Sequence, residues 1–203
     1  MRKLIVAAMI SLDGVMQAPG GPEEDTSGGF VYGGWVWPYA DADEEAMGGA
    51  FKRPFELLLG RRTYDIFAAY WPHVPEGAPH QHIADLFNGV TKHVATHHPE
   101  TLAWQNSRAL GPDIASSVRE LKRGDGPDLL TQGSSELVHQ LLATDLVDEL
   151  RLLVYPVLLG RGKRLFDGHA QASAFRLDES KTSSGVLITH YIREGEVRTG
   201  SFA

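Results

Sequence analysis

The 203-residue sequence contains no cysteine. Disulfide bonds, thiol nucleophiles and zinc or iron–sulfur sites with cysteine ligands are therefore excluded. The absence is also compatible with a cytoplasmic protein, which is the location that we expect. No stretch approaches the roughly 20 consecutive apolar residues of a membrane-spanning helix, so the sequence predicts no association with a membrane.

A signal peptide is the alternative to consider at the N-terminus, where Arg2-Lys3 precede the apolar run from Leu4 to Ile10. The run is short for the apolar region of a signal peptide, and Asp13-Gly14 follow it without a small-residue cleavage pattern. We therefore predict that Leu4 to Ile10 form a buried first strand.

An excess of positive charge is also lacking. The formal net charge of −7 argues against general nucleic-acid binding and leaves a small molecule as the expected partner. The apolar fraction of 42% is ordinary for a globular protein. Because the chain has neither an internal repeat nor a linker-like segment, we expect residues 1–203 to form a single domain.

The stretch from Asp128 to Phe166 shows a strand, a helix and a second strand in succession. The first strand ends at Gln132-Gly133-Ser134-Ser135, where residues that tolerate a sharp turn also suit the start of a helix. Unpaired backbone N–H groups at such a turn can bind a phosphate. A glycine needed only for packing is the alternative, and for one turn alone it is the better supported one.

A second turn of this kind follows the predicted strand from Phe55 to Leu59. It reads Gly60-Arg61-Arg62-Thr63-Tyr64 and opens a helix with an aromatic face. Two cations at a helix N-terminus oppose the helix dipole unless an anion lies among them. The arginines therefore indicate a phosphate site, and ion pairs with acidic side chains elsewhere are the alternative.

A long segment from Gln17 to Tyr39 is rich in glycine and proline and is the expected lid of a site. Its four aromatic residues would be costly in a solvated loop, so they should cover either the core or a ligand. These are Phe30, Tyr32, Trp35 and Trp37. A short helix with an acidic first turn is expected from Asp41 to Phe51.

The remaining predicted elements are two single strands, one helix and a hairpin of two strands. Strands are expected at Lys92–Thr96 and near Leu102–Trp104, a helix at 112–123, and a terminal hairpin of Phe175–Thr182 and Val186–Arg193. This order predicts an α/β fold with a mostly parallel sheet and an antiparallel edge. Five histidines between His80 and His98 match no closed metal site, so no metal is expected.

Four stretches in this order resemble the dihydrofolate reductase-like fold. Within that fold they resemble stand-alone relatives of the reductase (C-terminal) domain of the bifunctional riboflavin-biosynthesis deaminase-reductase. The stretches are Ser11 to Gly14, Leu59 to Tyr64, Thr131 to Ser134, and Leu146 to Leu150 together with Pro156 to Phe166. The resemblance implies a three-layer fold with helices on both faces of a mostly parallel central sheet and a C-terminal antiparallel hairpin.

The resemblance also implies NADPH as the cofactor. Ala8 and Val15 would adjoin the nicotinamide, and Thr96 and His97 would lie near the adenosine 2′-phosphate. The two turns described above would hold the other phosphates through Gly60, Arg61, Arg62, Thr63, Gln132, Gly133, Ser134 and Ser135.

The implied activity is hydride transfer to a small heterocycle, pterin-like or ribosylamino-pyrimidine-like. In folate-reducing relatives a carboxylate after the lid supplies the proton, and the spacing from Gly60 points to Glu44. Lys163 and Arg164 could hold a ribosyl phosphate, or they could be basic residues of a surface loop. Related reductase domains pair, so a homodimer is expected.

Departures from the family leave other functions open. The zinc deaminase half is not expected without cysteine, and the Gln132-Gly133-Ser134-Ser135 turn puts folate specificity in doubt. A non-catalytic nucleotide- or small-ligand-binding protein that kept the fold is the main alternative. A metal-dependent hydrolase that uses the histidines is the third.

Overall fold

The structure is a computed structural model that describes residues 1–42, 51, 53–166 and 168–202. Glu44 and most of the helix expected from Asp41 to Phe51 lie outside the described residues.

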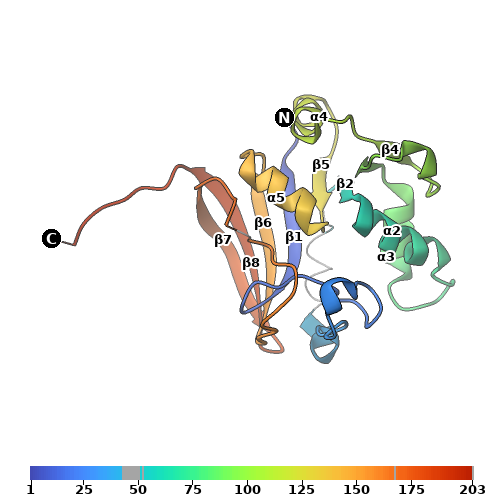
Figure 1. Cartoon of the computed structure of the whole chain (residues 1–203), viewed down its shortest axis with the longest axis horizontal. Helices are drawn as coiled ribbons and strands as arrows, with labels where there is room; N and C mark the ends of the chain where they lie inside the picture. The colour runs from blue at the N-terminus through green and yellow to red at the C-terminus, as the bar shows by residue number, and fades with distance from the viewer. Residues whose placement is uncertain (43–50, 52, 167, 203) are drawn as a thin grey trace.

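An eight-stranded sheet forms the centre of the fold, with the order β4-β3-β2-β5-β1-β6-β8-β7. Neighbouring strands from β4 to β6 pair in parallel, whereas β8 runs antiparallel to both β6 and β7. The strands are β1 (Leu4–Ser11), β2 (Phe55–Gly60), β3 (Lys92–Ala95), β4 (Ser107–Ala109), β5 (Asp128–Thr131), β6 (Glu149–Tyr155), β7 (Ala174–Ser183) and β8 (Val186–Gly195). The expected parallel sheet and terminal hairpin are confirmed (Figure 1).

Helices cover both faces of the parallel part of the sheet because its strands are apolar on both sides. Along β1, Leu4 and Val6 pack in the cluster that includes Val118 of α4 and Leu141 of α5. The alternate residue Ile5 packs in the cluster of α2 and α3. The helices are α2 (Arg61–Tyr70), α3 (Gln81–Gly89), α4 (Ile114–Arg123) and α5 (Ser135–Ala143).

In the middle of the chain, one helix was not predicted and one predicted strand was wrong. Helix α3 is only nine residues long, so its sequence carries a weak helical pattern. Its apolar face is recognisable mainly because Ile83 and Phe87 are buried against the sheet. The strand expected near Leu102–Trp104 lies instead at β4. Trp104 turns into the core, where its backbone N–H donates to the Tyr64 hydroxyl (2.9 Å).

The lid segment divides its aromatic residues between core and solvent. Phe30 and Trp35 are buried in a third apolar cluster, and the Trp35 ring meets the Tyr155 ring edge to face at 5.2 Å. Tyr32 and Trp37 are exposed. The buried pair ties the lid to the end of β6.

Candidate functional site

The turns after β2 and β5 meet at the carboxyl ends of these neighbouring strands. The Gly60 N–H donates to the Gly133 carbonyl (3.1 Å). A Cβ on Gly60 would overlap the Ser134 hydroxyl and lie 2.8 Å from the Ser134 backbone nitrogen. A Cβ on Gly133, whose φ is +134°, would lie 2.8 Å from Thr63 Oγ1. Glycine is therefore required at both positions, because the two turns lie too close together for a side chain.

This contact brings the first turns of α2 and α5 together at one edge of the sheet. The first N–H groups of a helix have no partner within the helix, and the dipole adds partial positive charge there. Gly60 is the N-cap of α2 and Ser134 is the N-cap of α5. Ser135 is the buried first residue of α5, and Gln132 lies partly buried before Gly133. Two adjacent helix N-termini suit a ligand with two linked phosphates.

Arg61 reaches from the start of α2 to the segment that follows β3. Its guanidinium pairs with Asp65 (2.9 Å) and donates to the hydroxyls of Thr96 (3.2 Å) and Thr101 (2.5 Å). The hydrogen bond with Asp65 raises the pKa of Arg61. His97 is exposed beside Thr96. The residues predicted to lie near the 2′-phosphate are thus neighbours in space.

Arg62 forms its ion pair with Asp25 of the lid (2.5 Å). Both arginines are therefore paired with carboxylates, as the alternative interpretation of the Arg61-Arg62 turn required. The second oxygen of Asp25 accepts from Lys163 (2.7 Å) in the loop after β6. Asp25 thereby links the lid, the start of α2 and that loop.

Ala8 and Val15, the expected neighbours of a nicotinamide, are both buried. Ala8 belongs to the apolar cluster that α4 and α5 cover. Val15 has an exposed fraction of 0% and forms an isolated bridge with Arg164. Val15 lies just before the lid, and its bridge with Arg164 in the loop after β6 brings it close to other candidate residues.

The segment just before the lid, residues 13–16, is fastened to the loop after β6 by backbone hydrogen bonds in both directions. Met16 N–H donates to the Lys163 carbonyl (2.8 Å), and Leu165 N–H donates to the Gly14 carbonyl (2.9 Å). Asp13 accepts from Gly160 N–H (2.8 Å) and pairs with Arg164. A hydrogen bond from Ser11, which outweighs burial, lowers the pKa of Asp13 to about 2, so this carboxylate stays ionised.

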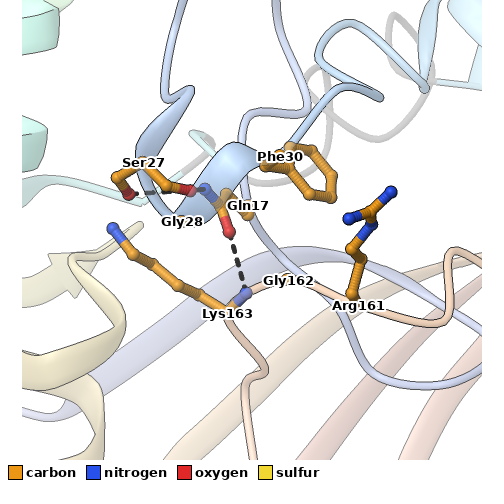
Figure 2. A pocket seen from close by; sticks show the side chains of 7 residues that line it. All are labelled: Gln17, Ser27, Gly28, Phe30, Arg161, Gly162 and Lys163. Carbon is orange, nitrogen blue, oxygen red and sulfur yellow. Dashed lines mark hydrogen bonds between the residues drawn. The ribbon is translucent and has the colours of Figure 1, made fainter.

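A cavity of about 280 Å³ lies between the lid and this loop. Its lining residues are Gln17, Ser27, Gly28, Phe30, Arg161, Gly162 and Lys163. Figure 2 shows the Arg161 and Lys163 side chains leaving the loop on either side of Gly162. The cavity combines an aromatic ring with two cationic side chains.

Sequence reasoning missed Gln17, Asp25 and Arg161 as site residues. One residue could have indicated this part of the site. Gly162 lies in the stretch from Pro156 to Phe166, which served only to recognise the fold. Its φ is +129°, and a Cβ there would lie 3.0 Å from the Phe30 ring. The contacts across the lid depend on tertiary structure.

Metal and membrane roles receive no support from the described part of the chain. There, no three side chains of histidine, aspartate or glutamate are placed to hold a metal ion. Likewise, among residues 1–42, 51, 53–166 and 168–202, no helix is long and apolar enough to cross a membrane.

The sheet order, the antiparallel outer strands and the paired helix N-termini define an α/β domain of the reductase type. The chain belongs to the RibD C-terminal domain family, which it matches over residues 2–189. The family supports an oxidoreductase that resembles the reductases of riboflavin biosynthesis.

The chain is similar to two curated proteins and, in fold, to two solved structures. The uncharacterized protein YyaP of Bacillus subtilis (strain 168) is 26% identical over 94% of both chains. YwjB of the same strain is 22% identical over 95% of this chain and 98% of its own length. A provisionally named riboflavin biosynthesis protein from Shewanella sp. PV-4 has a similar structure, with a TM-score of 0.61, 20% identity and coverage of 95% and 99%. A pyrimidine reductase-like protein from Corynebacterium diphtheriae has a TM-score of 0.55 at 13% identity, with coverage of 96% and 93%.

Proposed function

We propose that the protein is an NADPH-dependent reductase that transfers hydride to a small heterocycle, pterin-like or ribosylamino-pyrimidine-like. The observation that carries the proposal is the contact between the starts of α2 and α5. The close packing at Gly60 and Gly133 holds the two turns side by side, so one ligand could accept hydrogen bonds from the N-termini of both helices. A dinucleotide supplies the two linked phosphates that such a cradle fits.

The residues at this edge would divide the cofactor between them. Thr63, Gln132 and Ser135 adjoin the cradle and would contact the diphosphate. Arg61 and Thr96, which already share a hydrogen bond, would receive a 2′-phosphate. When bound, NADPH supplies the hydride. The chain would orient the reacting groups and exclude water, and Glu44 remains the proposed proton donor.

The cavity under the lid is the candidate position for the substrate. Its volume of about 280 Å³ lies near the lower end of the range for small-molecule sites. The Phe30 ring can pack against a planar heterocycle, while Arg161 and Lys163 can attract an oxygen-rich or anionic substituent.

Titration with NADPH, and separately with NADH, tests the proposed function. Trp35 is a suitable reporter because its indole N–H donates to the Gln17 carbonyl (2.8 Å) within the lid. We expect saturable quenching of tryptophan emission by NADPH and consumption of NADPH in the presence of a suitable pyrimidine or pterin. Failure of both nucleotides to bind at millimolar concentration would contradict the proposal. Binding without turnover of any such heterocycle would favour the non-catalytic alternative.

A further inference from the structure

Asp25 is a buried carboxylate held between two cations from separate parts of the chain. Its exposed fraction is 7%. One oxygen accepts from Arg62 Nη2 (2.5 Å) and from the Ser27 hydroxyl (2.6 Å), and the other accepts from Lys163 Nζ (2.7 Å). Burial raises the pKa of Asp25, but the hydrogen bonds from Lys163 and Ser27 outweigh it and lower the pKa below its ordinary value. The group is therefore an anion at neutral pH.

Gln17 holds this carboxylate in place. Its side-chain amide donates to the backbone carbonyls of Asp25 and Ser27, both at 3.0 Å. Its side-chain oxygen accepts from the Lys163 N–H (3.0 Å), as Figure 2 shows. The lid thus delivers a negative charge to the start of α2 and is itself anchored beside one of the two cations.

The two cations remain accessible although the carboxylate between them is not. The side chain of Arg62 is 49% exposed and that of Lys163 is 35% exposed, whereas that of Asp25 is 8% exposed. A ligand can therefore reach both cations from solvent. Arg62 is the second residue of α2, next to the proposed phosphate cradle. A phosphate group accepts from the same donors as a carboxylate and carries more negative charge.

We propose that Arg62 and Lys163 form an anion site that Asp25 occupies, and that a phosphate group of the cofactor replaces Asp25 there. The inference rests on the proposed function, which supplies the phosphate. Replacement frees the lid from α2, so binding of the cofactor is coupled to movement of the lid over the substrate cavity. Asp25 is then a built-in competitor that weakens the apparent affinity for phosphate.

Asp25→Asn tests this competition, with Glu23→Gln as the matched control. Both changes remove one negative charge from the same part of the lid, but Glu23 is exposed. Inorganic diphosphate and NADPH are the two probes, and tryptophan emission, to which Trp35 of the lid contributes, is the readout for both. We expect Asp25→Asn to bind both probes about tenfold more tightly than the unchanged protein, because the loss of a charged hydrogen-bond partner is of that order. Glu23→Gln should leave both affinities unchanged.

Equal or weaker binding of diphosphate by Asp25→Asn, or no binding at all, would overturn the inference. If Asp25→Asn does not fold, Lys163→Met decides instead. It should weaken diphosphate binding about tenfold, and an unchanged affinity overturns the anion site. Tighter diphosphate binding by Asp25→Asn without NADPH binding by any form would support the anion site and refute the proposed function. If the unchanged protein binds NADPH and Asp25→Asn binds it with the same affinity, the anion site is refuted and the proposed function is supported.

Discussion

Gly60 and Ser134, at the starts of two different helices, are in direct contact across the edge of the sheet. Each follows a strand of the parallel sheet, and β2 and β5 are neighbours although they are far apart in the sequence. The carboxyl ends of neighbouring parallel strands lie at the same edge, which is where open α/β sheets bind ligands. The contact therefore determines the distance between the two proposed phosphate-binding turns.

Gly60→Ala should separate these turns. The Gly60 backbone itself suits alanine, with φ −70° and ψ 153°, but the new Cβ would lie 2.8 Å from a backbone nitrogen that cannot rotate away. We expect a loss of about 1–3 kcal/mol in the free energy of unfolding, as for other overpacked sites. Urea denaturation measures it, and weaker NADPH binding should accompany it.

Gly89→Ala is the matched control for Gly60→Ala. Gly89 lies in α3, and a Cβ there would meet no atom within 4 Å. We expect no loss of stability from this change. Equal stability of the two variants would show that the close packing at Gly60 does not matter.

Arg61→Ala should distinguish NADPH from NADH. Arg61 shares a hydrogen bond with Thr96 where the 2′-phosphate is proposed to bind, and only NADPH carries that group. The variant should lose about tenfold in affinity for NADPH, because hydrogen bonds to charged groups contribute on that scale. Its affinity for NADH should barely change, as measured by quenching of tryptophan emission. Arg119→Ala, on the exposed side of α4, should alter neither affinity, and an equal loss for both nucleotides would contradict the assignment of Arg61.

Glu149 should make the protein sensitive to acid. The side chain is 1% exposed and pairs with Lys3 and His190. Burial raises its pKa, but these partners outweigh burial and bring the pKa from 4.5 to about 2. Because the folded pKa is the lower one, the ionised group stabilises the fold fully above about pH 5, and this contribution disappears as the pH falls to about 2. It is on the order of 3 kcal/mol.

Denaturation curves between pH 2 and 7 measure this contribution of Glu149, with Glu149→Gln for comparison. The variant should be less stable at neutral pH, because it removes the negative charge that pairs with Lys3, and its stability should vary less with pH. An identical pH dependence in both proteins would rule out Glu149 as the responsible group.

The outer strands support the proposal of a homodimer. Leu177 pairs with Tyr191, and Leu187 lies four residues from Tyr191 on the same strand, so both leucines project from one face of β7 and β8. They are 49% and 40% exposed, and these strands extend the sheet beyond α5 (Figure 1). Exposed apolar side chains on one face of a sheet suit an interface. We propose that the same face of a second copy covers them.

Light scattering at micromolar concentration tests the homodimer. The unchanged protein should have twice the mass of one chain, and the double variant Leu177→Asp, Leu187→Asp should have the mass of one chain. Leu158→Asp, at a loop residue that is 73% exposed, is the control and should remain a dimer. A single-chain mass for the unchanged protein would refute the proposal.

Much of the fold could be predicted from local patterns. The apolar run from Leu4 to Ile10, the alternation along Phe175 to Arg193 and the two glycine turns each indicated an element that the structure contains. Helix α3 could not be recognised, because its apolar face is short and is identified only by its packing against the sheet. Trp104 misled the strand prediction because its burial comes from contact with Tyr64.

The sequence by itself therefore determined most of the elements, their order and the two turns at which phosphates are proposed to bind. Periodicity, glycine and helix-start residues are local properties, and one strand or turn is enough to express them. Only the tertiary structure decided which charges meet. Arg62 could have faced a ligand anion or a carboxylate, and its pairing with Asp25, which also pairs with Lys163, depends on how the lid folds back over β6. Ion pairs between distant segments cannot be predicted from the spacing of residues in the sequence. The distance between the two charged groups depends on how the sheet and its loops fold.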